Sequence, residues 1–185
     1  GSFLAASLAF QVIPVTPASA TVIYARTLKE MAKSADAIVV GAVRDRVSQY
    51  GRDEHGTRIY TFTRIAIERS LKGKRLDEVM VRQWGGTVGD VTMKVPGNAE
   101  FAVRERVVLF LRSGQSGVFH LPNLAASKFS IRFEGQKTFL VRDLAGITFA
   151  SQSRDTGFRL LDDRLPSSKL TWEEFFKEIA EEVTK

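Results

Sequence analysis

The sequence predicts a mainly β protein, a small antiparallel OB-like barrel with a short N-terminal helix and an amphipathic C-terminal helix. Three observations predict this fold class. Short apolar or alternating segments recur between turns rich in glycine and charged residues. Strands do not alternate with helices, so a parallel sheet is not expected. Only two segments, one near each end of the chain, repeat apolar residues at helical spacing. A β-sandwich built from the same strands is the alternative.

The composition narrows the classes of function. A chain of 185 residues is long enough for one domain with its own core. The absence of cysteine excludes disulfide frameworks, thiolate zinc sites and cysteine nucleophiles. With Lys+Arg 27 and Asp+Glu 21 the net charge is +6, which favours acidic partners or simple solubility. The two histidines, His55 and His120, offer little for metal or acid–base chemistry. We expect no cofactor.

Residues 1–20 are typical of a secretory signal peptide whose basic start is missing. An uncharged apolar run over residues 3–10 precedes Ala18-Ser19-Ala20, a small-residue cleavage pattern. The run is too short, and too soon interrupted by proline, for a transmembrane helix, so we expect no membrane span. The chain is therefore expected to be exported, to a bacterial periplasm or outside the cell, with a single mature domain over residues 21–185. The alternative is an apolar strand that stays with the fold.

Two capping boxes predict where the helices begin. In Thr27-Leu28-Lys29-Glu30 the threonine hydroxyl and the glutamate can each cap a free backbone amide, which opens a short helix over residues 28–35. Thr171-Trp172-Glu173-Glu174 repeats the pattern and opens a terminal helix over residues 171–184. The terminal helix carries an apolar stripe, and its acidic face is expected to be solvated.

The strongest strand signal is a long antiparallel hairpin. Residues 38–50 begin as a continuous apolar run, and residues 57–71 alternate between apolar and polar side chains. The turn-rich segment 51–56 joins them. A barrel needs its first hairpin to bend strongly, and Gly41 is the expected bending point.

The remaining elements are shorter. The segment Trp84–Asp90, with three glycines in seven residues, is expected to be a flexible loop, and residues 143–170 an irregular segment. Further strands are expected at residues 78–82, 91–95, 107–111, 117–121, 128–133 and 137–141.

The search for catalytic motifs finds none. The serines of Ser113–Gly117 are out of register for a nucleophile elbow, and Gly85–Gly89 lacks the lysine of a phosphate-binding loop. The adjacent carboxylates of Asp53-Glu54 and Asp162-Asp163 would point to opposite faces of an extended chain. No metal-binding spacing occurs. We therefore predict no catalytic and no metal-binding residue, and a protein that is not an enzyme.

Basic residues interleave with aromatic ones along the hairpin, a pattern that can bind single-stranded nucleic acid on a barrel face. The aromatic side chains are Tyr60, Phe62 and Trp84. Export argues against such a partner, so no nucleic acid is expected.

Three segments carry a resemblance to a known fold family. Ser34–Val43, Ile65–Gly73 and Glu105–Leu111 resemble the netrin module, the OB-type barrel of tissue inhibitors of metalloproteinases. They are more similar still to uncharacterised bacterial exported proteins with the pattern AD-x-IVxG-x-V … LKG … GE-x-VVLFL. Here Arg104-Glu105 replaces the usual Gly-Glu. The resemblance covers about residues 34–133 and implies a fold more than an activity.

In those inhibitors an N-terminal cysteine chelates the zinc of the target. This chain has Thr21 at the expected mature N-terminus, so that side-chain role does not carry over. We expect an exported non-enzymatic binding module that contacts another exported protein. A proteinase inhibitor acting through its N-terminus and adjacent loops is the alternative, and a hydrolase the weaker one.

The predicted contact surface combines the mature N-terminus, the hairpin tip and the glycine-rich loop. Its residues are Thr21, Val22, Arg52, His55, Trp84, Gly85 and Gly86. The competing interpretation of Trp84 is that its ring fills the barrel interior.

Overall fold

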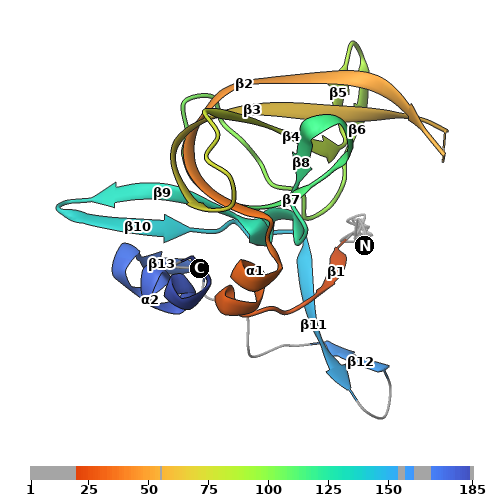
Figure 1. The fold of residues 1–185 in the computed structure, drawn as a ribbon. Helices are drawn as coiled ribbons and strands as arrows, with labels where there is room; N and C mark the ends of the chain where they lie inside the picture. Colours follow the sequence, from red (N-terminus) through yellow and green to blue (C-terminus); the bar gives the residue numbers. More distant parts are fainter. Residues whose placement is uncertain (1–19, 55, 154–156, 161–167, 184–185) are drawn as a thin grey trace, which may run out of the picture.

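The computed structural model describes residues 20–54, 56–153, 157–160 and 168–183, and it is mainly β, as expected (Figure 1). Residues 1–19, which carry most of the expected leader, lie outside the described part. The strands are β1 (Thr21–Tyr24), β2 (Ala37–Asp53), β3 (Gly56–Lys72), β4 (Glu78–Trp84), β5 (Gly86–Val88), β6 (Val91–Met93), β7 (Arg106–Ser113), β8 (Val118–His120), β9 (Lys128–Glu134), β10 (Lys137–Val141), β11 (Ile147–Ser153), β12 (Gly157–Leu160) and β13 (Lys169–Thr171). The helices are α1 (Leu28–Ser34) and α2 (Trp172–Val183), with 3₁₀ turns η1 (Gln115–Gly117) and η2 (Leu124–Ser127).

The long hairpin is the largest element, and its two strands, β2 and β3, have 17 residues each. Its register shifts between Val40 and Gly41 and again between Val43 and Asp45, which bends the pair. A Cβ added at Gly41 would lie 2.4 Å from the carbonyl oxygen of Ala66. The bend at Gly41 therefore depends on an approach between the two backbones that only glycine permits.

Five strands pair in a closed ring. Strand β7 pairs with β2, β2 with β3, β3 with β4, β4 with β8, and β8 returns to β7. The β4–β8 pairing is parallel, and the other four are antiparallel. Strands β9, β10 and β13 extend the sheet outward from β7.

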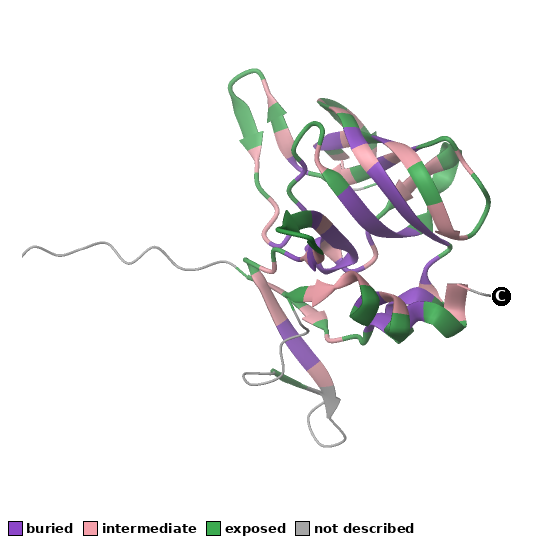
Figure 2. Ribbon diagram, turned by 90° about the vertical axis from the view of Figure 1, so that its left-hand side faces the viewer, coloured by how far each residue is buried: buried purple, intermediate pink, exposed green. Residues whose placement is uncertain are grey.

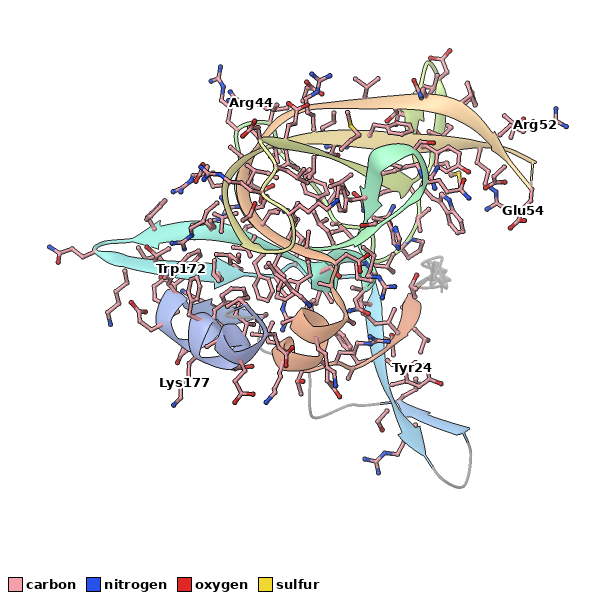
Figure 3. The ribbon with its side chains drawn as sticks, in the orientation of Figure 1. Tyr24, Arg44, Arg52, Glu54, Trp172 and Lys177 are labelled. Atoms are coloured by element: carbon pink, nitrogen blue, oxygen red, sulfur yellow. The ribbon has the colours of Figure 1, made fainter. Side chains whose placement is uncertain are left out.

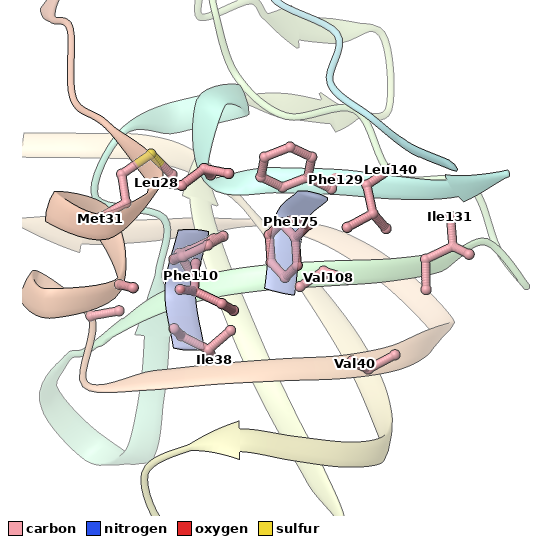
Figure 4. Close-up of a cluster of buried hydrophobic side chains, with 13 residues drawn as sticks. Leu28, Met31, Ile38, Val40, Val108, Phe110, Phe129, Ile131, Leu140 and Phe175 are labelled. Carbon is pink, nitrogen blue, oxygen red and sulfur yellow. The ribbon is translucent and has the colours of Figure 1, made fainter. Parts of the chain in front are cut away.

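The first part of β2, residues 37–43, and residues 107–111 of β7 are buried on both faces. One face of each contributes to a cluster inside the ring, with Val39, Leu109 and Leu111 at its centre. The other face contributes Ile38 and Phe110 to a second cluster beneath the helices (Figure 4). This double burial explains why both strands are continuous apolar runs in the sequence. Elsewhere buried and exposed residues alternate along the strands (Figure 2).

Both helices begin at the predicted capping boxes. Thr27 Oγ1 accepts from the Glu30 amide, and Glu30 Oε2 accepts from the Thr27 amide at 2.8 Å. Thr171 and Glu174 repeat both hydrogen bonds at the start of α2. Phe175 and Ile179 of α2 are fully buried, which confirms the predicted apolar stripe.

The prediction of an irregular segment over residues 143–170 is wrong where the structure describes it. Strand β11 pairs in parallel with β1, β12 pairs with β11, and β13 pairs with β10. The small sheet of β1, β11 and β12 projects from the rest of the molecule (Figure 1). Strands β11 and β13 depend on partners that are distant in sequence, β1 and β10, so local periodicity did not reveal them.

The glycine-rich segment Trp84–Asp90 is not simply a loop. Strand β5 pairs with β6 in a small two-stranded sheet, with Gly89 and Asp90 in the turn. The hydroxyls of Thr87 and Thr92 lie 2.9 Å apart across this pair.

Candidate binding surface

Trp84 ends β4 on the outside of the ring. Along β4 the alternate residues Val79 and Val81 point inward and are buried, so Trp84 lies on the opposite face, where it is 47% exposed. The guanidinium carbon of Arg58 lies 5.3 Å from the centre of the indole ring. The interpretation of Trp84 as a plug of the ring interior is therefore wrong.

Tyr60 lies beside Trp84 and ties the hairpin tip to this outer face. Its hydroxyl donates to Asp53 Oδ2 at 2.5 Å, and Arg82 lies over its ring at 5.2 Å. Asp53 raises the pKa of the Tyr60 hydroxyl, mainly through this hydrogen bond. A Cβ at Gly51 would come within 2.7 Å of the Tyr60 ring, so the ring packs directly on the backbone of β2.

The predicted tip residues lie beyond the part of the hairpin that Tyr60 holds in place. Arg52 and Glu54 lie at the free end of the hairpin, where Arg52 is exposed (Figure 3). His55 lies outside the described residues.

At Gly85 and Gly86 the backbone lies in close contact with the hairpin of β2 and β3. Both have positive φ, 91° and 133°. The amide of Gly85 donates to Ile59 O at 2.8 Å, and its carbonyl accepts from Thr61 Oγ1 at 2.7 Å. A Cβ at Gly86 would lie 2.3 Å from Thr61 Oγ1 and equally close to Ser48 Oγ. The two glycines therefore serve a close backbone approach, and they position Trp84 beside them.

A cavity of about 620 Å³ lies beneath these glycines, inside the end of the ring. Its lining includes several polar groups, namely the hydroxyls of Thr61 and Thr63, the amides of Gln83 and Asn98, and the guanidinium of Arg46. Thr63 Oγ1 is buried and has no hydrogen-bond partner among the described residues. Arg46 is held in place in this wall, because its guanidinium donates a hydrogen bond to the carbonyl of Phe101 at 2.7 Å.

The expected mature N-terminus reaches the rim of the same cavity. The Thr21 nitrogen donates to Gly146 O at 2.9 Å and its hydroxyl donates to Pro96 O at 2.7 Å; Gly146 and Pro96 both line the cavity. Val22, the next residue of β1, is 53% exposed. The structure thus gathers Thr21, Trp84, Gly85 and Gly86 around one end of the ring. The nitrogen and the hydroxyl of Thr21 are thus both engaged in hydrogen bonds at this rim.

Three basic residues that the predicted contact surface does not include lie on neighbouring strands beside it. Arg82, His120 and Arg112 come from β4, β8 and β7, which the parallel β4–β8 pairing brings together. A groove of about 390 Å³ beside them is lined in part by Arg82, Trp84 and His120. The sequence predicts His120 only as part of a strand over residues 117–121, with little to offer metal or acid–base chemistry. The alternation that buries its neighbours also places its own side chain outside.

Among the described residues no group of three or more His, Asp or Glu side chains is arranged to hold a metal ion. In the same residues no helix has the length and apolar character to cross a membrane. Comparison with protein-family models and with curated protein sequences found no match.

Proposed function

We propose that the ring of five strands is an OB-like barrel. Its strand order supports this: the first hairpin, β2–β3, continues into β4, and the last two strands, β7 and β8, close the ring against β2 and β4. A five-stranded Greek-key barrel with a long bent first hairpin has this arrangement. The apolar cluster inside the ring and the bulge at Gly41 agree with closure.

On this barrel we propose a non-enzymatic binding module of an exported protein, acting through protein–protein contacts. The observation that carries the proposal is Trp84, a half-exposed indole held in place by Arg58 and by the backbone at Gly85. Tryptophan and arginine are the side chains that most often dominate the binding energy of protein interfaces. A large ring already fixed by its neighbours loses little conformational entropy when a partner covers it.

A matched pair of variants tests the proposed function. Immobilised protein beginning at Thr21 is incubated with envelope extracts, as wild type, Trp84→Ala and Phe133→Ala. Phe133, on β9, is 63% exposed and provides an aromatic control distant from Trp84 in the sheet order. We expect a partner that wild type and Phe133→Ala retain, and that Trp84→Ala binds about tenfold or more weakly.

The stability of the Trp84→Ala variant distinguishes a loss of binding from a loss of folding in this experiment. Trp84→Ala is expected to unfold at the same urea concentration as wild type within a few tenths of a molar unit, because half of the ring is already in water. If the variant is unfolded, or if it retains the same partner as strongly as wild type, the proposed surface is wrong.

A further inference from the structure

A row of basic side chains crosses the three adjacent strands β4, β8 and β7 beside Trp84. Tyr60 of β3 lies under Arg82 of β4. In the parallel β4–β8 pairing Val81 is opposite Phe119, so Arg82 and His120 follow on the same outer face. Arg112 of β7 is the direct cross-strand partner of His120. Three cationic or titratable groups thus stand next to one another on neighbouring strands.

The row borders a groove with room for a ligand. The groove measures about 390 Å³, within the usual range of small-ligand sites. Arg82, Asn98 and His120 give it polar walls, and Trp84 and Leu121 lie among its apolar lining residues. The Asn98 amide group donates to Trp84 O at 2.6 Å, which fixes the wall between loop and strand.

The charge of this row is only partly balanced. Asp36 Oδ2 lies 3.3 Å from Arg112 Nε and also accepts from the Ser113 amide, so Arg112 is neutralised. No carboxylate among the described residues lies within 4.0 Å of the Arg82 guanidinium, which faces a neutral aromatic ring. An anion in the groove would supply the missing partner of Arg82.

We propose that this groove binds a carboxylate-rich peptide segment, with one carboxylate held between Arg82 and His120 and an aliphatic stem against Trp84. The inference rests on the proposed function and names the chemistry of its partner. A single strand of nucleic acid fits less well. It needs successive open rings for stacking, whereas of the two rings beside this groove Tyr60 is buried beneath Arg82 and Trp84 alone is exposed.

The same geometry gives the interaction a pH dependence. Burial lowers the pKa of His120, the positive charges of Arg112 and Arg82 lower it further, and Asp36 acts in the opposite direction. Free His120 is therefore neutral at pH 7, and a bound carboxylate favours its protonated form. Affinity must rise as the pH falls from the pKa of the bound form to that of the free form.

Fluorescence anisotropy with a fluorescein-labelled hexaglutamate peptide tests the proposal. We expect wild-type protein to bind it at least threefold more tightly at about pH 5.5 than at about pH 8, since histidine titrates between them. Arg82→Gln should weaken binding about tenfold at both pH values, because a charge-assisted hydrogen bond is lost. His120→Gln should remove the pH dependence and leave the affinity at the higher pH unchanged.

Controls distinguish this site from general attraction to a basic protein. Arg44→Gln removes the same charge from an exposed position on β2 (Figure 3) and should leave binding within twofold of wild type. An equal effect of Arg44→Gln and Arg82→Gln would overturn the proposal. So would hexaglutamate that does not bind, or an oligo-dT strand that binds in its place. If Trp84-dependent capture from envelope extracts persists in those cases, the proposed function stands and only the acidic partner is wrong.

Discussion

Arg104 has a backbone conformation that side chains rarely adopt. Its φ is 71°, in the left-handed region, and its amide donates to Val43 O at 2.8 Å to close the turn before β7. Glycine occupies this conformation at no steric cost, and the pattern that the chain resembles has glycine at this position. The turn therefore forms here although the side chain of Arg104 makes its left-handed backbone conformation unfavourable.

Arg104→Gly should raise the free energy of unfolding by about 1 kcal/mol, because it relieves the left-handed penalty. Urea unfolding followed by fluorescence measures the change. Gly135→Ala is the reverse control: Gly135 has φ 60° with open space around its Cβ position, so the variant should lose about 1 kcal/mol. A destabilised Arg104→Gly variant would show that the arginine side chain stabilises the turn.

Glu105, the next residue, is the most deeply buried of the ion-paired carboxylates in the part of the chain that the structure describes. Its side chain is 7% exposed and that of Lys128 10%, with 2.8 Å between the charged atoms. Burial alone would raise the pKa of Glu105, but hydrogen bonds from Lys128, from the Ser130 hydroxyl at 2.5 Å and from the Ala102 amide outweigh it and lower the pKa. The carboxylate is thus a stabilising group only while it is ionised.

Glu105→Gln should cost about 3 kcal/mol of stability at neutral pH, because it leaves Lys128 buried without its counter-charge. Since the folded pKa lies below the ordinary value of 4.5, wild type should lose this contribution as the pH falls from that value through the folded pKa. The free energy of unfolding measured across this range should fall less steeply for the variant. Adding Lys128→Met should recover part of the loss; a double variant that loses the sum of two single effects would contradict the coupling.

Helix α2 is held by an aromatic cluster more than by its caps. Phe175 meets Phe110 and Phe129 edge-on, with ring centres 6.0 Å and 5.4 Å apart. Arg69 of β3 lies 5.5 Å from the Trp172 ring and so fastens the helix to the hairpin as well. The helix is thereby part of the core of the molecule. Its buried residues belong to the same apolar cluster as residues of α1, β2 and β7.

Phe175→Ala should lower the free energy of unfolding by about 3–5 kcal/mol, as expected for a fully buried ring. Circular dichroism should show the loss of helical signal at lower urea than in wild type. Phe133→Ala, which removes an exposed ring, should change stability by about 0.5 kcal/mol or less. Equal effects of the two variants would mean that α2 does not depend on the packing of Phe175 in the aromatic cluster.

At the scale of elements, the sequence was informative where a segment carries its own pattern. The capping boxes, the stripe of α2 and the alternation of β3 follow from local spacing, and all three were predicted. Strands β1 and β11 were not, because each is defined by pairing with the other. The exposure of Trp84 could not be predicted, because the sequence indicates a strand only over residues 78–82 and a loop from Trp84 onward. The groove at His120 depends on the parallel β4–β8 contact, which no local pattern contains.

The molecule as a whole has two apolar clusters on opposite faces of the same two strands. Val39 and Leu109 face the ring interior, and Ile38 and Phe110 face the helices. Because β2 and β7 belong to both clusters, neither cluster can separate without exposing the other. The described residues should therefore unfold as one cooperative unit.

The two tryptophans report separately on the five-stranded ring and on helix α2. In Trp172→Phe the fluorescence comes from Trp84 beside the ring cavity, and in Trp84→Phe it comes from Trp172 on α2. Each variant's urea midpoint by fluorescence should match its own midpoint by circular dichroism. Fluorescence of Trp172 that changes well before the loss of β signal would instead show that the helical layer detaches on its own.

The parallel pairing of β1 with β11 also has a kinetic consequence. It joins residues 21–24 to residues 147–150, so the loop closed by this contact spans 126 residues of the chain. During synthesis β1 must wait until residues 147–150 have emerged before its partner exists. Contacts of such long sequence separation form late, so the hairpin of β2 and β3 should be protected from hydrogen exchange before β1 is. The first strand of the domain is thus expected to be among the last to take its place.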